Sequence, residues 1–334
     1  MLDDSVVAFL KKIGAGSAPE APIGDLESAR QILDVRFRAY PPPVRPVERN
    51  ETVSISANGG VFDALICWPN LKPDNELLPL LLWFHGGGWT LGSAAAQQGI
   101  CRYLCAEAGI VVANIDYRLA PEWPFPSGSE DAYEALLWMI SNAARLGINP
   151  TRISVGGASA GGHLAAVLAQ TARDRGSAVI DFQALIYPCT SLRDEPLAYP
   201  SRARLGNGDY GVSMAEFEWL RGHFLPDMAL ADDLRASPAL AADLFGLPDA
   251  LIVTAEYDPL VDEGADYAQR LGEAGVAVEY QCVRGMIHGF VEVPGYFAQG
   301  QEILDLLAAR LASRARTADM PVSAATSRPN GADR

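Results

Sequence analysis

The feature that most constrains the fold of this chain is a serine set among small residues, where a strand-like stretch gives way to a helix-like one. Residues 152–155 have strand character, residues 157–161 read Gly-Ala-Ser-Ala-Gly, and an alanine- and leucine-rich stretch follows. The pattern G-x-S-x-G is typical of a nucleophile elbow, in which glycines two residues either side of the serine let strand and helix approach closely. It predicts that the Ser159 hydroxyl projects above a sheet and that the amide of Ala160 points at the same space.

A phosphate-binding loop is the alternative interpretation of this glycine-rich turn. A Walker loop requires Gly-Lys-Ser or Gly-Lys-Thr, which is absent here, and a dinucleotide-binding turn requires G-x-G-x-x-G with a later acid. The elbow interpretation in turn needs partners for the serine elsewhere in the chain.

Length and charge exclude several classes of partner. The 334 residues suffice for one large α/β domain or two smaller ones, and 49% hydrophobic with 20% charged residues is ordinary for a globular protein. The formal net charge of -15 argues against nucleic acid and anionic membranes, because both need clustered Lys and Arg. No stretch approaches the roughly 20 apolar residues of a membrane span. The first residues carry acids rather than a basic segment, so we expect no signal peptide.

The cysteines favour a cytoplasmic location. Their odd number and scattered spacing indicate unpaired thiols. Cys101 and Cys105 lie four apart on a predicted helix, but no other cysteine or histidine lies nearby in sequence to complete a metal site. We expect them on a half-buried helix face. The five cysteines are Cys67, Cys101, Cys105, Cys189 and Cys282.

Strand and helix patterns alternate along most of the chain. A hairpin is predicted within residues 53–68, turning around Asn58-Gly59-Gly60. Continuous apolar stretches, typical of strands buried on both faces, cover residues 79–84, 109–116, 152–155, 182–187, 250–255 and 278–283. Helices are predicted over residues 94–108, 129–145, 160–173, 262–274 and 297–312. The alternation predicts an α/β fold with a mostly parallel central sheet and helices on both faces.

Two segments stand outside this alternation. Residues 1–45 carry two helical patterns ended by three prolines, and form either a lid or a packing arm. A long connection over residues 189–248 includes an amphipathic stretch at 215–224, and long insertions of this kind are usually lids or binding loops. We expect it to be the second half of a cap.

The predicted domain organisation follows from these segments. Residues 1–45 form an N-terminal cap segment, and residues 46–313 form the catalytic domain with a cap insertion at about 190–235. Residues 314–334 lack apolar periodicity, and we expect a disordered tail.

A second motif follows the strand predicted at residues 79–84. Residues 85–89 read His-Gly-Gly-Gly-Trp, and three glycines leave backbone N–H groups free to turn toward a developing oxyanion. Such a loop accompanies the nucleophile elbow in one group of hydrolases. A flexible linker is the alternative, but a buried strand before the loop and an aromatic residue after it argue against that.

The general base can be found by elimination among four histidines. His85 belongs to the glycine-rich loop, His163 lies on the helix of the elbow and should point along it, and His223 lies in the predicted cap. His288 lies in a glycine-bounded loop after a strand, where its imidazole can reach over the sheet edge. We therefore predict His288 as the base.

The acid should lie between the serine and the histidine in chain order. Asp258 follows a buried strand, and Pro259 restricts its backbone to extended conformations. Glu256 lies nearer the strand, and Asp262 and Glu263 are better suited as N-cap and first-turn carboxylates of the next helix. Asp258 is the predicted acid.

These motifs together resemble the hormone-sensitive-lipase family of α/β-hydrolases, the bacterial family IV carboxylesterases. The resemblance spans about residues 50–311 and rests on residues 85–89, Asp-Tyr-Arg-Leu-Ala-Pro-Glu at 116–122, residues 157–162, 258–260 with 262–264, and His-Gly-Phe at 288–290. It implies an α/β-hydrolase fold with a helical cap formed by the N-terminal helices and the insertion. It also implies that the amides of Gly87, Gly88 and Ala160 form the oxyanion hole.

Two positions depart from the family pattern. Ala158 stands where the family usually has Asp or Thr, and His163 stands where Asn is common. Neither is a predicted triad member, but both can alter the support around the elbow and the response to pH.

The resemblance implies a serine carboxylesterase that acts on short- to medium-chain acyl esters through an acyl-enzyme, without metal or organic cofactor. In this chemistry Ser159 attacks, His288 moves the proton and Asp258 orients the imidazole. An amidase or deacetylase with the same triad remains an alternative, as does a non-catalytic small-molecule-binding relative. The expected partner is a small-molecule ester, and a homodimer is left open.

Aromatic residues of the cap and the loop are expected to wall the acyl site. A closed apolar pocket would favour acetyl to hexanoyl esters over long-chain triglycerides. The expected wall residues are Phe9, Trp89, Phe217, Trp219 and Phe224.

Overall fold

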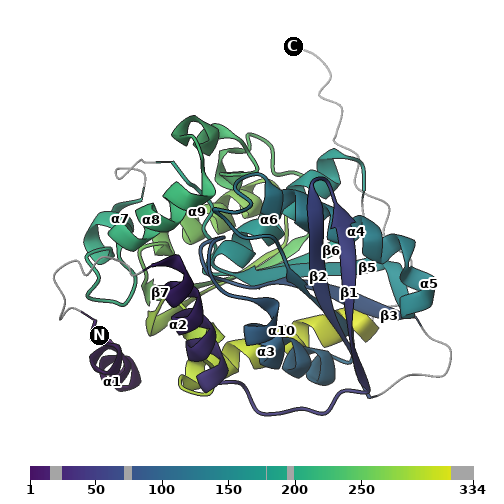
Figure 1. Cartoon of the computed structure of the whole chain (residues 1–334), viewed down its shortest axis with the longest axis horizontal. Helices are drawn as coiled ribbons and strands as arrows, with labels where there is room; N and C mark the ends of the chain where they lie inside the picture. The colour runs from purple at the N-terminus through teal and green to yellow at the C-terminus, as the bar shows by residue number, and fades with distance from the viewer. Residues whose placement is uncertain (16–24, 71–76, 178, 194–198, 317–334) are drawn as a thin grey trace.

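The computed structural model describes residues 1–15, 25–70, 77–177, 179–193 and 199–316. Within these residues, eight strands form one sheet in the order β1-β2-β4-β3-β5-β6-β7-β8, with helices on both faces (Figure 1). β1 pairs antiparallel with β2, and β2 antiparallel with β4, whereas every later pairing is parallel. The predicted α/β fold with a mostly parallel sheet is confirmed.

The strands lie where the sequence patterns predicted them; most are longer than predicted, but β4 begins two residues later. They are β1 (Arg49–Ala57), β2 (Gly60–Trp68), β3 (Leu78–Phe84), β4 (Val111–Asp116), β5 (Ile148–Ala158), β6 (Ile180–Ile186), β7 (Asp249–Tyr257) and β8 (Val278–Ile287). The α-helices are α1 (Asp4–Ile13), α2 (Leu26–Ala39), α3 (Ala94–Ala108), α4 (Ser127–Ser141), α5 (Ala143–Leu146), α6 (Ala160–Asp174), α7 (Pro200–Leu205), α8 (Met214–Phe224), α9 (Val261–Glu273) and α10 (Ala298–Arg316). Short 3₁₀ helices are η1 (Met228–Asp232), η2 (Pro238–Leu240) and η3 (Phe290–Glu292).

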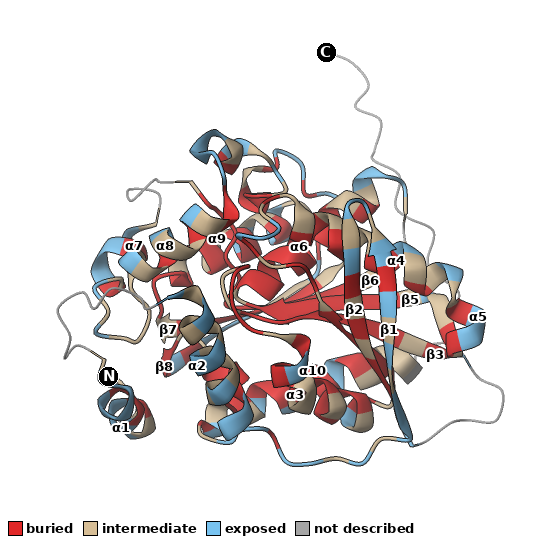
Figure 2. Ribbon diagram, in the orientation of Figure 1, coloured by how far each residue is buried: buried red, intermediate tan, exposed pale blue. Residues whose placement is uncertain are grey.

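The sheet separates two buried clusters, as side-chain alternation requires. In β3, Leu80 and Leu82 pack on the face covered by α4, α6 and α9. Leu81 and Trp83 point to the opposite face, which α3 and α10 cover. The central strands are therefore buried on both sides (Figure 2).

The last strand, β8, departs from the prediction. We expected residues 278–283 to be buried on both faces, but Tyr280, Gln281 and Cys282 are exposed. β8 forms an edge of the sheet and pairs with β7. An edge strand has one strand neighbour, so part of its surface stays open to solvent.

Helix ends also differ from the prediction at two places. The helix predicted over residues 129–145 is divided into α4 and α5, because the backbone leaves helical geometry at Asn142 (φ −103°, ψ 11°). α10 continues to Arg316, so residues 314–316 belong to a helix rather than to the predicted tail. The disorder predicted for residues 317–334 concerns residues outside those described.

The cysteines at positions 101 and 105 are fully buried on α3 rather than half-buried as expected, and they pack near Cys67 of β2. All five thiols are unpaired. No helix in the described ranges is both long enough and apolar enough to cross a bilayer.

Candidate active site

The elbow between β5 and α6 holds Ser159 in a backbone conformation that few side chains adopt. Its φ is 56° and ψ −117°, and its amide donates to the carbonyl of Ile186 at 2.9 Å. A methyl group at Gly157 or Gly161 would collide with the carbonyl of Phe84 at the end of β3. The glycines of the motif are therefore needed because a neighbouring strand passes against the turn.

A serine, an imidazole and a carboxylate meet above the carboxyl ends of three strands. His288, directly after β8, places Nε2 2.9 Å from Oγ of Ser159. Its Nδ1 lies 2.7 Å from Oδ2 of Asp258, which follows β7. Oδ1 of Asp258 accepts from the amide of Leu260 at 2.8 Å. The carboxylate selects the tautomer with hydrogen on Nδ1, which leaves Nε2 free to accept the serine proton.

Electrostatics favour the protonated imidazole. Burial lowers the pKa of His288, but the charge and hydrogen bond of Asp258 raise it, and so do the charges of Glu292 and Glu216. The net result is a pKa above the ordinary value of 6.5.

The neighbouring carboxylates are occupied elsewhere. Glu256 accepts from the amide of Gly285 at 2.7 Å, and Asp262 accepts from the amide of Ser201 at 2.7 Å. Neither lies in hydrogen-bond contact with the imidazole. Of the competing acids, Asp258 alone contacts His288 among the described residues.

The N-cap role predicted for Asp262 is wrong, whereas the prediction of a first-turn carboxylate at Glu263 is confirmed. α9 begins at Val261 with Leu260 as N-cap and no side-chain cap, so both acids lie in its first turn. Glu263 is buried and forms an ion pair with Arg202 of α7. The long insertion packs against this turn. Its backbone amides at Ser201 and Thr190 donate hydrogen bonds to the carboxylates of Asp262 and Glu263.

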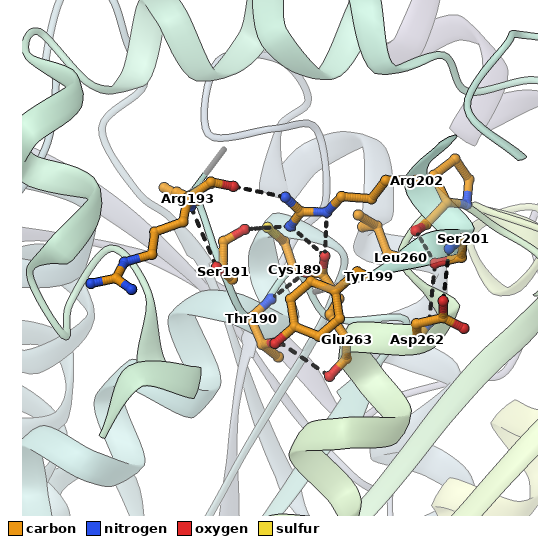
Figure 3. Close-up of polar contacts among 12 residues, drawn as sticks. Cys189, Thr190, Ser191, Arg193, Tyr199, Ser201, Arg202, Leu260, Asp262 and Glu263 are labelled. Carbon is orange, nitrogen blue, oxygen red and sulfur yellow. Dashed lines mark hydrogen bonds and ion pairs between the residues drawn. The ribbon is translucent and has the colours of Figure 1, made fainter. Parts of the chain in front are cut away.

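Figure 3 shows this junction between the insertion and α9. The Arg202 guanidinium donates to Glu263 at 2.9 Å through Nε, and to the carbonyls of Ser191 at 2.6 Å and Arg193 at 2.9 Å. The other oxygen of Glu263 accepts from the amide of Thr190 at 2.7 Å. Burial raises the pKa of Glu263, while the charge of Arg202 opposes that shift. Donors on both oxygens let a buried charge pair persist in the fold.

The glycine-rich loop after β3 exposes its amides to the same space. Gly87 and Gly88 have φ of 125° and 59°, and both line the cavity with Ser159. A methyl at Gly87 would collide with the carbonyl of Leu91, and one at Gly88 would lie 2.6 Å from a methyl of Leu220. Within the described residues, neither amide donates to another backbone group. The Ala160 amide is in the first turn of α6, where helical geometry supplies no acceptor.

The other three histidines point away from Ser159. His163 is buried; its Nδ1 accepts from Nε1 of Trp89 at 2.9 Å, and its Nε2 donates to the carbonyl of Ala236 at 3.1 Å. Burial lowers the pKa of His163 to about 4. His85 stacks on Tyr117 with ring centroids 4.3 Å apart. His223 places Nδ1 2.9 Å from the carbonyl of Trp219.

A cavity lies over Ser159 and is mostly apolar. Two segments far apart in sequence supply its walls above the strand-end loops: α1 with α2, and α8 with Val212, which lies two residues before it. Their apolar lining residues include Phe9, Leu33, Phe37, Met214, Phe217 and Leu220. The same two segments also contribute the charged side chains Arg36 and Glu216 to the lining.

Three of the five expected wall residues line the cavity. They are Phe9, Phe217 and Trp89. Phe224 lies behind the wall, stacked on Trp89 with centroids 4.7 Å apart. Trp219 lies instead beside His223, 4.5 Å between ring centroids. On α8, Trp219 falls on a different face from Phe217, because successive residues turn by about 100°. Phe224 shares the face of Phe217 but lies two turns further along the helix.

Glu292 is a cavity-lining residue that the sequence analysis missed. Its carboxyl group is buried beneath the glycine-rich loop, four residues after His288. The only sequence signal was an acid close behind the predicted base, which gives no indication of burial.

A sheet of this topology carrying a serine, imidazole and carboxylate in hydrogen-bond contact defines a serine hydrolase of the α/β-hydrolase fold. The comparisons with known proteins agree. A family model described as alpha/beta hydrolase fold matches residues 81–292. The chain belongs to the hormone-sensitive-lipase family of α/β-hydrolases, and it is a carboxylic ester hydrolase.

Relatives and solved structures give the extent of this similarity. The chain is 40% identical over 267 residues to carboxylesterase NlhH of Mycobacterium tuberculosis, covering 78% of this chain and 82% of that protein. It is 41% identical over 297 residues to the carboxylic ester hydrolase LipN of the same species, covering 86% and 77%. The hyperthermophilic esterase from the archaeon Pyrobaculum calidifontis is similar in structure, with a TM-score of 0.85 and 35% identity over 93% of this chain and 98% of that one.

Proposed function

We propose that this chain hydrolyses short- to medium-chain acyl esters through an acyl-enzyme intermediate, with Ser159, His288 and Asp258 as its catalytic triad. The observation that carries the proposal is the pair of contacts on one imidazole: 2.9 Å from Nε2 to the serine oxygen and 2.7 Å from Nδ1 to the carboxylate. The serine that makes the first contact also faces the cavity.

The reaction follows from this geometry. Ser159 Oγ attacks the ester carbonyl while Nε2 of His288 takes its proton, and the imidazolium then gives that proton to the leaving alcohol. Asp258 holds the imidazole in the productive tautomer and stabilises its charged form. Water enters after the alcohol has left, and the same proton transfers release the acid.

The oxyanion of each tetrahedral intermediate is held by the amides of Gly87, Gly88 and Ala160. Supporting this role, the two glycine residues border the same cavity as Ser159, and their amides have no backbone acceptor in the part of the chain that the structure describes. A preorganised donor of this kind contributes about 3 kcal/mol to transition-state stabilisation.

The preference for short chains rests on a cap. We assign residues 1–45 and about 190–235 to this cap and residues 46–313 to the catalytic domain. Apolar side chains from α1, α2 and α8 meet over Ser159 and enclose the acyl group. An enclosed site admits a soluble ester more readily than a lipid aggregate. The five unpaired thiols support a cytoplasmic location.

A rate series tests the substrate class. We expect kcat/KM for p-nitrophenyl esters to be highest from acetyl to hexanoyl and to decline for longer chains, with Ser159→Ala as the inactive control. Faster turnover of emulsified long-chain triglyceride than of soluble butyrate ester would contradict the proposal. An anilide hydrolysed as fast as the matching ester would assign the chain to amidases instead.

A further inference from the structure

A second buried carboxyl group lies beside the proposed triad. Glu292 ends η3, is 5% exposed and reaches the cavity that holds Ser159. Its Oε1 accepts from Nε2 of Gln97 on α3 at 2.5 Å, and Oη of Tyr187 lies 3.5 Å from its Oε2. The backbone amide of Gly86 also acts on this carboxyl group and lowers its pKa. A buried acid is costly unless donors surround it, and here they come from three separate segments.

The contact with Gly86 ties the carboxyl group to the oxyanion loop. Gly86 is the first of the three glycines, directly before the two whose amides face the cavity. A methyl group on Gly86 would collide with Oε1 of Glu292 and lie 3.1 Å from the carbonyl of Ala158. The loop is therefore held between the elbow strand on one side and the Glu292 side chain on the other.

The orientation of Gln97 favours the ionised acid. Its Oε1 accepts from Nε1 of Trp83 at 3.2 Å, so its NH₂ group is the part that faces Glu292. An NH₂ group and a backbone amide can only donate, and donated hydrogen bonds stabilise a carboxylate.

We propose that Glu292 is a positioning residue: in its ionised form it holds the oxyanion loop through the Gly86 amide and places a second negative charge near the imidazole of His288. It contacts no reacting atom. It acts on the loop that receives the oxyanion and on the charge that forms when His288 takes the serine proton.

Of the titratable groups around Glu292 in the described residues, Glu292 and His288 are the two that change charge near neutral pH. Burial raises the pKa of Glu292 to about 7, against the opposing effects of the His288 charge and the three donors. Tyr187, from the end of β6, and Tyr117, from the end of β4, also face it. Burial raises the pKa of both phenols well above the ordinary value, so they stay neutral. Asp258 and Glu216 act on His288 from its other neighbours.

Two substitutions separate this role from mere packing, and their predicted effects on the pH profile have opposite signs. Glu292→Gln keeps the shape of the side chain but removes the charge that favours imidazolium. The acid limb of kcat/KM should then move to lower pH by about half a unit. Gln97→Leu leaves the acid but removes a donor that lowers its pKa, so its ionisation needs higher pH and the acid limb should move upward. Glu302→Gln, on the exposed surface of α10, is the control.

Inhibitor binding reports on the oxyanion loop itself. A trifluoromethyl ketone adds Ser159 Oγ to its carbonyl carbon, passes the serine proton to His288 and leaves an alkoxide in the oxyanion hole. The matching methyl ketone binds without forming that alkoxide. Glu292→Gln should weaken the trifluoromethyl ketone by about tenfold and leave the methyl ketone unchanged.

The inference rests on the proposed roles of Ser159 and the loop, and the experiment separates the two failures. Wild-type protein without esterase activity would overturn the proposed function. Active wild type whose Glu292→Gln variant keeps the acid limb in place and loses both ketones equally would overturn this inference alone. If that variant does not fold, Gln97→Leu decides: a downward shift of its acid limb, or no shift, overturns the inference.

Discussion

The floor and the cap of the cavity are built differently. The floor consists of the loops that follow β3, β5, β7 and β8, whose backbones pack against one another. The cap above it contributes mainly side chains. The floor depends on steric contacts that allow no extra atom: a methyl on Gly161 would collide with Phe84, and one on Gly86 with Glu292. Its serine, imidazole and carboxylate are paired with one another through His288.

The cap is attached in another way. Arg30 of α2 forms an ion pair with Glu122 at 2.7 Å in which the two side chains are 23% and 54% exposed. Exposed pairs of this kind contribute about 1 kcal/mol or less. The insertion is attached through a buried pair, Arg202–Glu263, with side chains 4% and 0% exposed. The difference indicates that the chemistry tolerates almost no change in the floor, while substrate preference can change through single side chains in the cap.

The sharpest test of the floor is the removal of one charge. Asp258→Asn should lower kcat by about 10⁴, because the amide stabilises the wrong imidazole tautomer. Asp262→Asn should leave kcat within a few-fold, since its oxygen can still accept from Ser201. Turnover of p-nitrophenyl butyrate with thermal melts distinguishes them. Near-normal turnover in the first variant together with a collapse in the second would move the acid to Asp262.

Breaking the buried cap attachment should be the largest effect outside the floor. Arg202→Met leaves Glu263 charged without its partner, and removing one member of a buried pair costs about 3–5 kcal/mol of unfolding free energy. The double variant Arg202→Met/Glu263→Leu should recover part of that loss. Urea unfolding measures both, with Arg30→Met as the exposed-pair control. Equal, small losses for Arg202→Met and Arg30→Met would show that the two attachments do not differ as described.

His163 connects the two regions, because it bonds Trp89 of the floor and Ala236 at the end of the insertion. Its pKa is lowered to about 4 by burial, so the folded protein keeps it neutral while the unfolded chain protonates near pH 6.5. The neutral His163 therefore contributes fully to the free energy of unfolding above about pH 6.5. This contribution decreases by up to about 3 kcal/mol as the pH falls toward 4.

His163→Asn should remove this part of the pH dependence. The test is to measure the free energy of unfolding of wild type and variant at pH 7 and at pH 5. The loss between the two pH values should be smaller in the variant than in the wild type. A variant that loses as much stability between these pH values as the wild type would contradict the assignment.

The smallest effect is expected in the cap wall. Phe217→Ala enlarges the cavity and should raise the octanoate-to-butyrate ratio of kcat/KM by about tenfold, since added methylenes in an apolar pocket each contribute on the order of 1 kcal/mol. Trp219→Ala is the matched control, because that ring lies on the same helix but does not line the cavity. A change in the ratio for Trp219→Ala, or none for Phe217→Ala, would show that α8 is not the wall of the acyl site.

The sequence by itself determined the mostly parallel sheet, the alternation of strands and helices along the chain, and the elbow, because these follow from residue patterns that can be recognised along the chain. α3 begins and ends where the pattern predicted. The spacing of small residues around Ser159 is a recognisable motif, although the atoms that require it belong to the distant strand that ends at Phe84. Elimination among the four histidines indicated His288, and chain order indicated Asp258, which the structure brings into contact with it.

Only the tertiary structure decided which polar groups meet. Asp262 and Glu263 have the sequence of helix-start carboxylates, yet the insertion, far away in the chain, supplies their donors. In the sequence, Glu292 resembles an ordinary loop acid. In the folded chain it is buried against α3 and the oxyanion loop. Burial and partners depend on which distant segments pack together, and local periodicity carries no record of that.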